Sequence, residues 1–205
     1  MIQTIIFDLG GVLVRTEDRL PRQQLAEKFG MTYEEMDQLV YGSASAKLAG
    51  QGAISAEEHK KEVLKNLDLP LDSFKSFGDE FWGGDRLDNK LVEFIRDLKG
   101  EYNTALLSNA WDDLRPLLVN FWKIAGIFDH IFISAELKLA KPDPRIYQHV
   151  INELGLDPAA LIFVDDFIEN VEAARDAGIN AIHFRSREQA LMELAEYLDR
   201  DLSII

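Results

Sequence analysis

Four short polar clusters, each close to an apolar segment, contain the side chains best suited to chemistry. They are a carboxylate, a hydroxyl beside an amide, an ammonium group and a carboxylate pair, contributed by Asp8, Ser108-Asn109, Lys141 and Asp165-Asp166. Oxygen ligands without histidine or cysteine suit Mg²⁺, while a lysine and a hydroxyl suit phosphate oxygens. A carboxylate can attack phosphorus only if the repulsion between two anions is screened, as a metal ion and a lysine can do. The set therefore points to Mg²⁺-assisted chemistry on a phosphate group.

The first cluster belongs to an apolar strand that ends on a charge. Residues 2–7 are predicted to form this strand, which leads directly to Asp8. A strand buried on both faces is a continuous apolar run, so Asp8 is expected at the rim of the core, where open α/β sheets bind ligands. Gly10 and Gly11 then allow the backbone to turn tightly and to approach a ligand closely.

The elements that must position these clusters alternate between strand and helix. Further strands are predicted over Asn103–Leu107, His130–Ile133, Leu161–Val164 and Asn180–Phe184. Helices are predicted over Leu87–Leu98, Asp113–Trp122, Pro144–Leu154, Ile168–Ala177 and about Arg187–Leu198. This alternation indicates βαβ units and a parallel sheet. Because the carboxyl ends of parallel strands share one edge, the four clusters are expected to converge on one crevice.

The segment between Thr16 and Gly84 has a different sequence pattern, which predicts helices and no convincing strand. Four helices are predicted, over Leu20–Phe29, from Thr32, from Ser55 to Leu67, and from Pro70 to about Gly83. We therefore expect an α/β domain, a doubly wound parallel sheet formed by residues 1–15 and 85–205. A small α-helical cap is expected at 16–84, inserted after the first strand.

The ordered motifs resemble those of the haloacid dehalogenase superfamily of hydrolases. The matching segments are Phe7-Asp8-Leu9-Gly10-Gly11, Leu107-Ser108-Asn109, Lys141-Pro142-Asp143-Pro144 and Val164-Asp165-Asp166. Among subgroups, the chain looks most like bacterial sugar-phosphate phosphatases and the N-terminal phosphatase domain of epoxide hydrolases. The resemblance implies a Rossmann-like core with the sheet order 5-4-1-2-3, a cap, and cap closure over the crevice.

The resemblance also implies a role for each matched residue. Asp8 would be the nucleophile that forms an aspartyl-phosphate, and it would bind Mg²⁺ together with the Gly10 carbonyl and Asp166. Asp165 and Asn170 would support the metal site from behind. Asp166 is preferred as the ligand because it stands four residues before Asn170, the spacing usual in the family.

The phosphate-binding residues follow from the same resemblance. Ser108 and the Asn109 backbone would bind the phosphoryl oxygens. Lys141 would bind substrate and neutralise charge on the aspartate and on the transferring group.

One position departs from the family pattern. Phosphatases of the family usually carry a second aspartate two residues after the nucleophile, to protonate the leaving group and then to activate water. Here that position is Gly10, and general acid–base catalysis contributes about 10²–10⁴-fold. Three explanations stay open: a leaving group that needs little protonation, a donor from the cap or the following loop such as Glu17 or Asp18, or weak activity. The sugar-phosphatase-like subgroup includes members with this glycine, which favours modest activity.

The composition limits the partners. The net charge of −14 repels nucleic acid and anionic membranes, and no apolar run reaches the roughly 18 residues of a membrane span. There are no cysteines, so disulfides and thiolate sites are excluded. We expect a cytoplasmic protein without a signal peptide, acting on a small phosphorylated substrate and without an obligate protein partner.

The leading interpretation is therefore a Mg²⁺-dependent phosphatase acting through an aspartyl-phosphate. A 2-haloacid dehalogenase also lacks the second aspartate, but it needs no metal, so the acid pair Asp165-Asp166 argues against it. A catalytically silent binding domain that kept the fold is the third alternative.

Overall fold

A five-stranded parallel sheet forms the centre of the molecule. The computed structural model describes residues 1–199 of the chain. Its strands are β1 (Thr4–Phe7), β4 (Asn103–Ser108), β5 (His130–Ile133), β6 (Leu161–Asp165) and β7 (Asn180–His183), in the order β5-β4-β1-β6-β7. Numbered along the α/β part alone, this is the predicted order 5-4-1-2-3 read from the other edge. The predicted fold class and strand order are confirmed.

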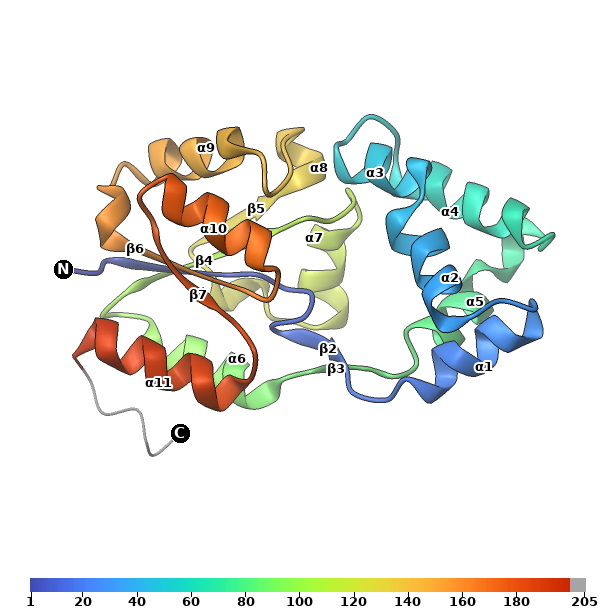
Figure 1. Ribbon diagram of the computed structural model, residues 1–205, viewed down its shortest axis with the longest axis horizontal. Helices are drawn as coiled ribbons and strands as arrows, with labels where there is room; N and C mark the ends of the chain where they lie inside the picture. Colours follow the sequence, from blue (N-terminus) through green and yellow to red (C-terminus); the bar gives the residue numbers. More distant parts are fainter. Residues whose placement is uncertain (200–205) are drawn as a thin grey trace.

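Helices cover both faces of the sheet (Figure 1). On one face lie α6 (Asn89–Leu98), α7 (Leu114–Pro116) and α11 (Arg187–Leu198), and on the other lie α8 (Ser134–Leu137), α9 (Pro144–Leu154) and α10 (Ile168–Asp176). Side chains of β1 alternate between the two layers: Ile5 and Phe7 pack in the core with α6 and α11, and Ile6 packs with α9 and α10. A strand buried on both sides must be apolar throughout. For this reason the first charged residue of this segment comes only after the last residue of β1.

Five helices follow β1 and lie beside the α/β layers. They are α1 (Leu20–Lys28), α2 (Tyr33–Asp37), α3 (Ala44–Gly50), α4 (Ala56–Asn66) and α5 (Phe74–Phe81). They share an apolar core of their own that includes Leu25, Met36, Leu64 and Phe81. The prediction of four helices missed α3. This helix is too short to show a clear period, and it depends on the Ser43 side chain, which caps the Ala46 amide.

A two-stranded antiparallel ribbon connects the helical insert to the sheet. Its strands are β2 (Val14–Thr16) and β3 (Asp85–Leu87), with Val14 opposite Leu87 and Thr16 opposite Asp85. No strand was predicted at these positions, because three residues without an apolar alternation give no recognisable signal. The division into a core at 1–15 and 85–205 and a cap at 16–84 stays a prediction.

The remaining helical turns are short. They are π-helical at Gln38–Gly42 and Leu117–Phe121 and 3₁₀-helical at Leu71–Ser73, Ala125–Ile127 and Pro158–Ala160. Across residues 1–199, no helix has both the length and the apolar character needed to cross a membrane.

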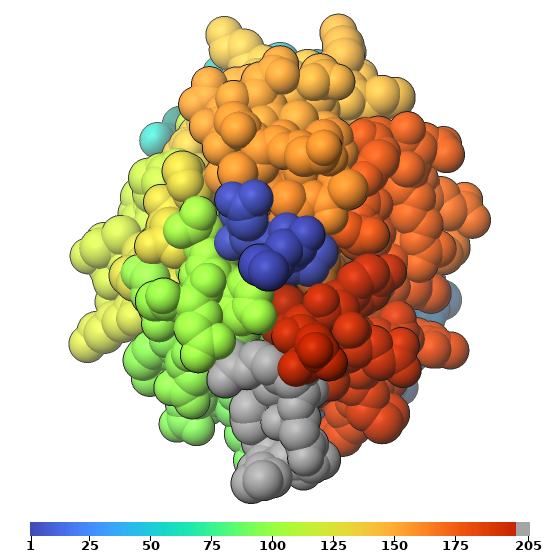
Figure 2. Space-filling view, turned by 90° about the vertical axis from the view of Figure 1, so that its left-hand side faces the viewer, coloured from blue at the N-terminus to red at the C-terminus, as the bar shows by residue number. Residues whose placement is uncertain are grey.

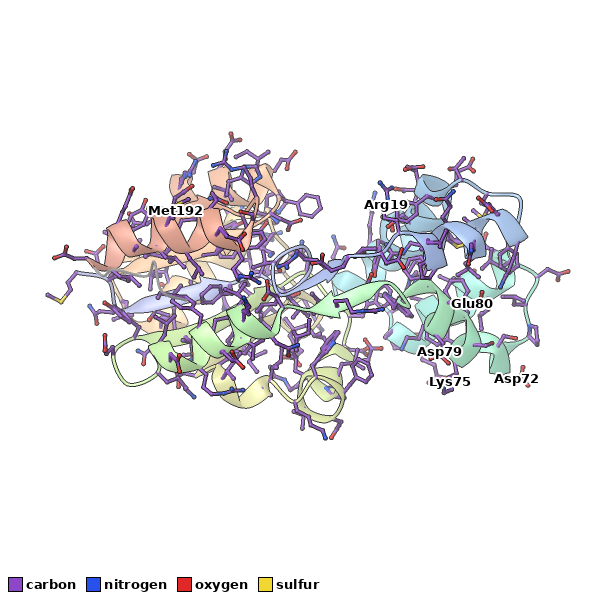
Figure 3. The ribbon with its side chains drawn as sticks, turned by 90° about the horizontal axis from the view of Figure 1, so that it is seen from below. Arg19, Asp72, Lys75, Asp79, Glu80 and Met192 are labelled. Atoms are coloured by element: carbon purple, nitrogen blue, oxygen red, sulfur yellow. The ribbon has the colours of Figure 1, made fainter. Side chains whose placement is uncertain are left out.

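The two ends of the molecule differ. Figure 2 shows the end that faces away from the helical insert, where the first residues of the chain (blue) lie between α9 (orange) and α11 (red). This is the amino edge of the strands. At the opposite end of the molecule, Lys75 and Asp79 point outward from the insert (Figure 3) and form an exposed ion pair of 2.6 Å. The carboxyl edge of the strands therefore faces the insert.

Candidate active site

The register of three neighbouring strands brings the polar clusters together. Phe7 of β1 lies opposite Leu106 of β4 and Val164 of β6, so the chain positions that follow each strand are side by side. The Asp8 amide continues the ladder by donating to the Val164 carbonyl at 2.9 Å. Asp8 therefore emerges directly beside Asp165 and one residue short of Ser108. The convergence expected from parallel pairing is observed.

Lys141 lies between two of the carboxylates. Its Nζ is 2.9 Å from Asp8 Oδ1 and 2.6 Å from Asp165 Oδ2, and it also donates to the Leu107 carbonyl at 3.0 Å. All three charged side chains are buried. Isolated buried charges are strongly unfavourable, and pairing with hydrogen bonding compensates for their lost hydration.

Burial and neighbouring charges decide the protonation of this group. Burial, opposed by Lys141 and assisted by the charge of Asp165, raises the pKa of Asp8 to about 7. Burial alone would lower the pKa of Lys141, but Asp8 and Asp165 outweigh it and hold that pKa above its ordinary value. Lys141 therefore stays positively charged, and its charge does not fully offset the effect of burial on Asp8.

Asp165 and Asp166, although adjacent, have different surroundings. Both oxygens of Asp165 are occupied, because Asn170 Nδ2 donates to them at 3.0 and 3.1 Å, the Phe167 amide donates to Oδ1, and Lys141 donates to Oδ2. Asp166 Oδ1 is also buried, yet it has no hydrogen-bond partner. Burial, and then the charge of Asp165, raise the pKa of Asp166 to about 6. A buried carboxylate oxygen without a donor is a position at which a cation would be stabilised.

The donor set fits a divalent cation. One oxygen from each of Asp8, Asp165 and Asp166 can be chosen so that all three lie within 4.8 Å of one another. Hard oxygen donors without nitrogen or sulfur match Mg²⁺. Among the three, Asp8 and Asp166 have the capacity to bind it, because the oxygens of Asp165 already accept other hydrogen bonds.

The second cluster positions the lysine. Ser108 is buried at the end of β4, and Asn109 follows it at the surface. The Asn109 side chain makes two hydrogen bonds with the Lys141 main chain, both of 2.8 Å: its Nδ2 donates to the carbonyl, and its Oδ1 accepts from the amide. From the sequence, only the Asn109 backbone was expected to take part in the site, by binding phosphoryl oxygens. The side-chain contact joins two loops 32 residues apart, and no local pattern predicts it.

Two further supports were not expected from the sequence. His183 at the end of β7 contacts the Asp166 carbonyl through Nε2 at 3.0 Å. Tyr147 of α9 is fully buried and donates to the Asn170 carbonyl at 2.9 Å. The carboxylate pair is thus held from the adjacent strand and from the helix layer behind it.

An open cavity of about 420 Å³ adjoins the carboxylates. The residues that line it include Gly11, Arg15, Asp166, Phe184 and Arg187. Gly11 has a φ of +75°, and a Cβ there would lie 2.0 Å from an oxygen of Asp166. Only glycine allows this approach. The second glycine of the sequence motif is therefore required by the position of Asp166.

Comparison with known proteins agrees with this geometry. Residues 2–178 match the sequence profile of the haloacid dehalogenase-like hydrolases. A sesquiterpene phosphatase of Aspergillus oryzae is 26% identical over 93% of this chain and 94% of its own length. A D-ribitol-5-phosphate phosphatase of Bacteroides thetaiotaomicron is 27% identical over 87% of this chain and 89% of its own length.

A solved structure shares the fold. It is a haloacid dehalogenase family enzyme of Bacteroides thetaiotaomicron in complex with magnesium and inorganic phosphate. It aligns with a TM-score of 0.76 at 23% identity, over 91% of this chain and 96% of its own. The fold and the family resemblance inferred from the motifs are both confirmed.

Proposed function

Because the chain belongs to the haloacid dehalogenase-like hydrolases, we propose that it is a Mg²⁺-dependent phosphatase that acts through an aspartyl-phosphate on Asp8. The substrate would be a small phosphorylated metabolite, such as a sugar phosphate. The observation that carries this proposal is the buried group of Asp8, Lys141 and Asp165 beside the unpartnered oxygen of Asp166. The two full-length phosphatase relatives support the same reaction class.

The residues of the site have distinct parts in the proposed reaction. Asp8 attacks phosphorus, and the bond to the leaving oxygen breaks as the bond to the carboxylate forms. Lys141 neutralises negative charge on Asp8 and on the transferring group. The Ser108 hydroxyl and the Asn109 backbone bind phosphoryl oxygens, while the Asn109 side chain fixes the loop that carries Lys141. Water then hydrolyses the acyl phosphate, which releases phosphate and restores Asp8.

A magnesium ion would be held by Asp8, the Gly10 carbonyl and Asp166. When bound, it supplies the positive charge that allows one anion to approach another. Asp165 and Asn170 would keep the metal-binding loop in place, since Asn170 donates to Asp165 and the Phe167 amide closes the turn. Such supporting contacts typically change metal affinity or activity by about 10–100-fold. Each of the predicted site residues thus has a part in the same proposed reaction.

Phosphate release from a panel of phosphorylated metabolites tests the function. We expect release that requires Mg²⁺, stops with EDTA, and falls by at least about 10³-fold in Asp8→Asn, which removes the nucleophile. Beryllofluoride with Mg²⁺ should form an adduct on Asp8 of the native protein. Asp97→Asn, a matched change on the exposed side of α6, should retain full activity.

Two outcomes would contradict the proposal. Halide release from 2-haloacids that persists in EDTA would indicate a dehalogenase. Neither activity, with no beryllofluoride adduct, would indicate a silent binding domain.

A further inference from the structure

We propose that the substrate is a phosphate ester of a hydroxyl more acidic than a simple alcohol, such as a hemiacetal, an enol or a phenol. This inference rests on the phosphatase function proposed above and names the substrate class for that site. It depends on which side chains near Asp8 could donate a proton to the leaving group.

The position two residues after Asp8 is empty space. Gly10 is exposed, and a Cβ built on it would meet no atom within 4 Å. Its backbone is outside the left-handed region in which L side chains are strained. The glycine is thus not required by crowding at its Cβ position.

The next carboxylates in the chain are already engaged. Glu17 accepts from Arg15 Nε at 3.1 Å, and Asp18 accepts at 2.9 Å from the amide of Leu20, the first residue of α1. Both carboxylates are thus oriented by donors on their own segment of the chain. Neither of the two candidates expected from the sequence is therefore arranged to donate a proton to a leaving group.

The acids on the other loops at this edge are engaged as well. Asp112 accepts from the Ala56 amide at 2.9 Å, and Asp113 forms an ion pair with Lys60. Asp143 accepts from the amide and Nε of Arg145, which lower its pKa to about 2. Each of these three side chains is thus already bound to a hydrogen-bond donor or a cation of the protein.

Two further titratable groups, His59 and Asp166, are excluded as proton donors for other reasons. His59 is buried, with Nδ1 against Ser45 at 2.8 Å and Nε2 against the Val40 carbonyl at 2.9 Å. Burial lowers its pKa, so it is neutral at physiological pH. Asp166 is assigned to the metal. The proposed reaction therefore proceeds without a proton donor from the loops described above.

The chemical step is balanced without such a donor. Asp8 forms its bond to phosphorus, the bond from phosphorus to the leaving oxygen breaks, and that oxygen departs with the electron pair as an anion. It then takes a proton from water. A second water attacks the aspartyl-phosphate and its proton passes to solvent, so that ester and water become alcohol and phosphate. The barrier depends on how stable the departing anion is, which selects acidic hydroxyls.

The test measures how strongly the rate depends on the leaving group. kcat/KM is determined with a series from para-nitrophenyl phosphate through phenyl phosphate to an alkyl phosphate. The native protein, Gly10→Asp and the isosteric control Gly10→Asn are compared. kcat/KM is chosen because it includes departure of the leaving group and excludes the later hydrolysis of the acyl phosphate.

We expect kcat/KM of the native protein to fall steeply along the series. Gly10→Asp should gain about 10²–10⁴-fold on the alkyl phosphate and little on para-nitrophenyl phosphate, whereas Gly10→Asn should gain on neither. The slope of the native protein is decisive even if a variant fails to fold.

A flat series in the native protein, with Asp8-dependent activity, would overturn this inference and leave the phosphatase function intact. An equal gain in Gly10→Asn and Gly10→Asp would overturn it too, because shape and not the proton would then be responsible. No Asp8-dependent release from any ester would overturn the proposed function, and the inference with it.

Discussion

At the scale of single residues, the site depends on one cation that is shared. Lys141 compensates two buried carboxylates at once, through contacts of 2.9 and 2.6 Å. A third carboxylate, Asp166, has a buried oxygen without a hydrogen-bond partner. The charges of the protein groups at this site are therefore not fully balanced, and the proposed Mg²⁺ would add the missing positive charge.

Removing Asp166 should reveal this cation directly. We expect Mg²⁺ to raise the melting temperature of the native protein, because a ligand that binds the folded state stabilises it. In Asp166→Ala, the Mg²⁺ concentration needed for the same increase should rise at least about tenfold, the lower bound for loss of even an indirect contact. Asp176→Asn, an exposed acid of α10, is the control. An unchanged Mg²⁺ response in Asp166→Ala would exclude Asp166 as a ligand.

The convergence of these residues was predictable, and their detailed contacts were not. Parallel pairing places the ends of β1, β4 and β6 at one edge, so the positions of Asp8, Ser108 and Asp165 follow from the strand pattern alone. The pairing of Asn109 with Lys141 depends on the path of two loops. Sequence spacing contains no information about that path.

At the scale of elements, a buried acid joins the ribbon to two helices. Asp88 begins α6 by accepting from the Leu91 amide, and it also accepts from Arg15 of β2 at 2.8 Å and from Arg187 of α11 at 2.9 Å. Arg15 in turn donates to the Val12 carbonyl at 2.7 Å, in the loop behind Asp8. One side chain thus fixes the ribbon relative to the nucleophile loop.

Asp88→Asn should destabilise the protein in a pH-dependent way. Burial alone would raise the pKa of Asp88, but Arg15, the Leu91 amide and Arg187 outweigh it and lower that pKa below its ordinary 3.8. The ionised form therefore stabilises the fold. We expect a loss of about 1.5 kcal/mol in the free energy of unfolding at neutral pH, the lower end for hydrogen bonds to charged groups.

The sign of the pH dependence follows from the lowered pKa. The stabilisation is fully present above pH 3.8 and is lost as the pH falls through the lower pKa of the folded state. Urea unfolding of the native protein and of Asp88→Asn should therefore differ at neutral pH and converge in strong acid. A difference that is constant across this range would contradict the charge argument. Asp97→Asn on the same helix should show no such pH-dependent difference.

The elements that the sequence did not predict are the shortest ones. The ribbon strands have three residues each, and α3 has seven. The ribbon depends on partners that are distant in the chain: Asp85 accepts from the Thr16 hydroxyl at 2.7 Å, and Asp85 also pairs with Arg22 of α1. Long periodic segments such as α6 and α9 contain enough apolar positions to be recognised alone.

At the scale of the whole molecule, the loop after β4 fastens the helical insert to the sheet. Trp111 packs with the cluster of apolar residues in the insert, and its ring lies 4.5 Å from His59 and 6.2 Å from Tyr41. The next two residues, Asp112 and Asp113, bind the first turns of α4. The same loop begins with Ser108 and Asn109, so the predicted phosphate-binding residues and the insert are mechanically connected.

Trp111→Ala should loosen this connection without unfolding the insert. We expect faster hydrogen exchange in residues 109–113 and in the first turn of α4, because both lose a packed neighbour. The amides of Val63 and Leu64, buried in the core of the insert, should retain their protection. Phe121→Ala, which removes an aromatic ring that is 71% exposed, is the control. Equal exchange in both variants would show that the loop does not fasten the insert.

The antiparallel pairing of β2 with β3 makes residues 17–84 the loop of a single hairpin. The chain enters and leaves the insert at one seam, and none of the five sheet strands passes through it. Replacement or loss of this segment during evolution would therefore leave the topology of the five-stranded sheet intact. The insert and the sheet that carries the proposed phosphate site would then be able to change in sequence independently of each other.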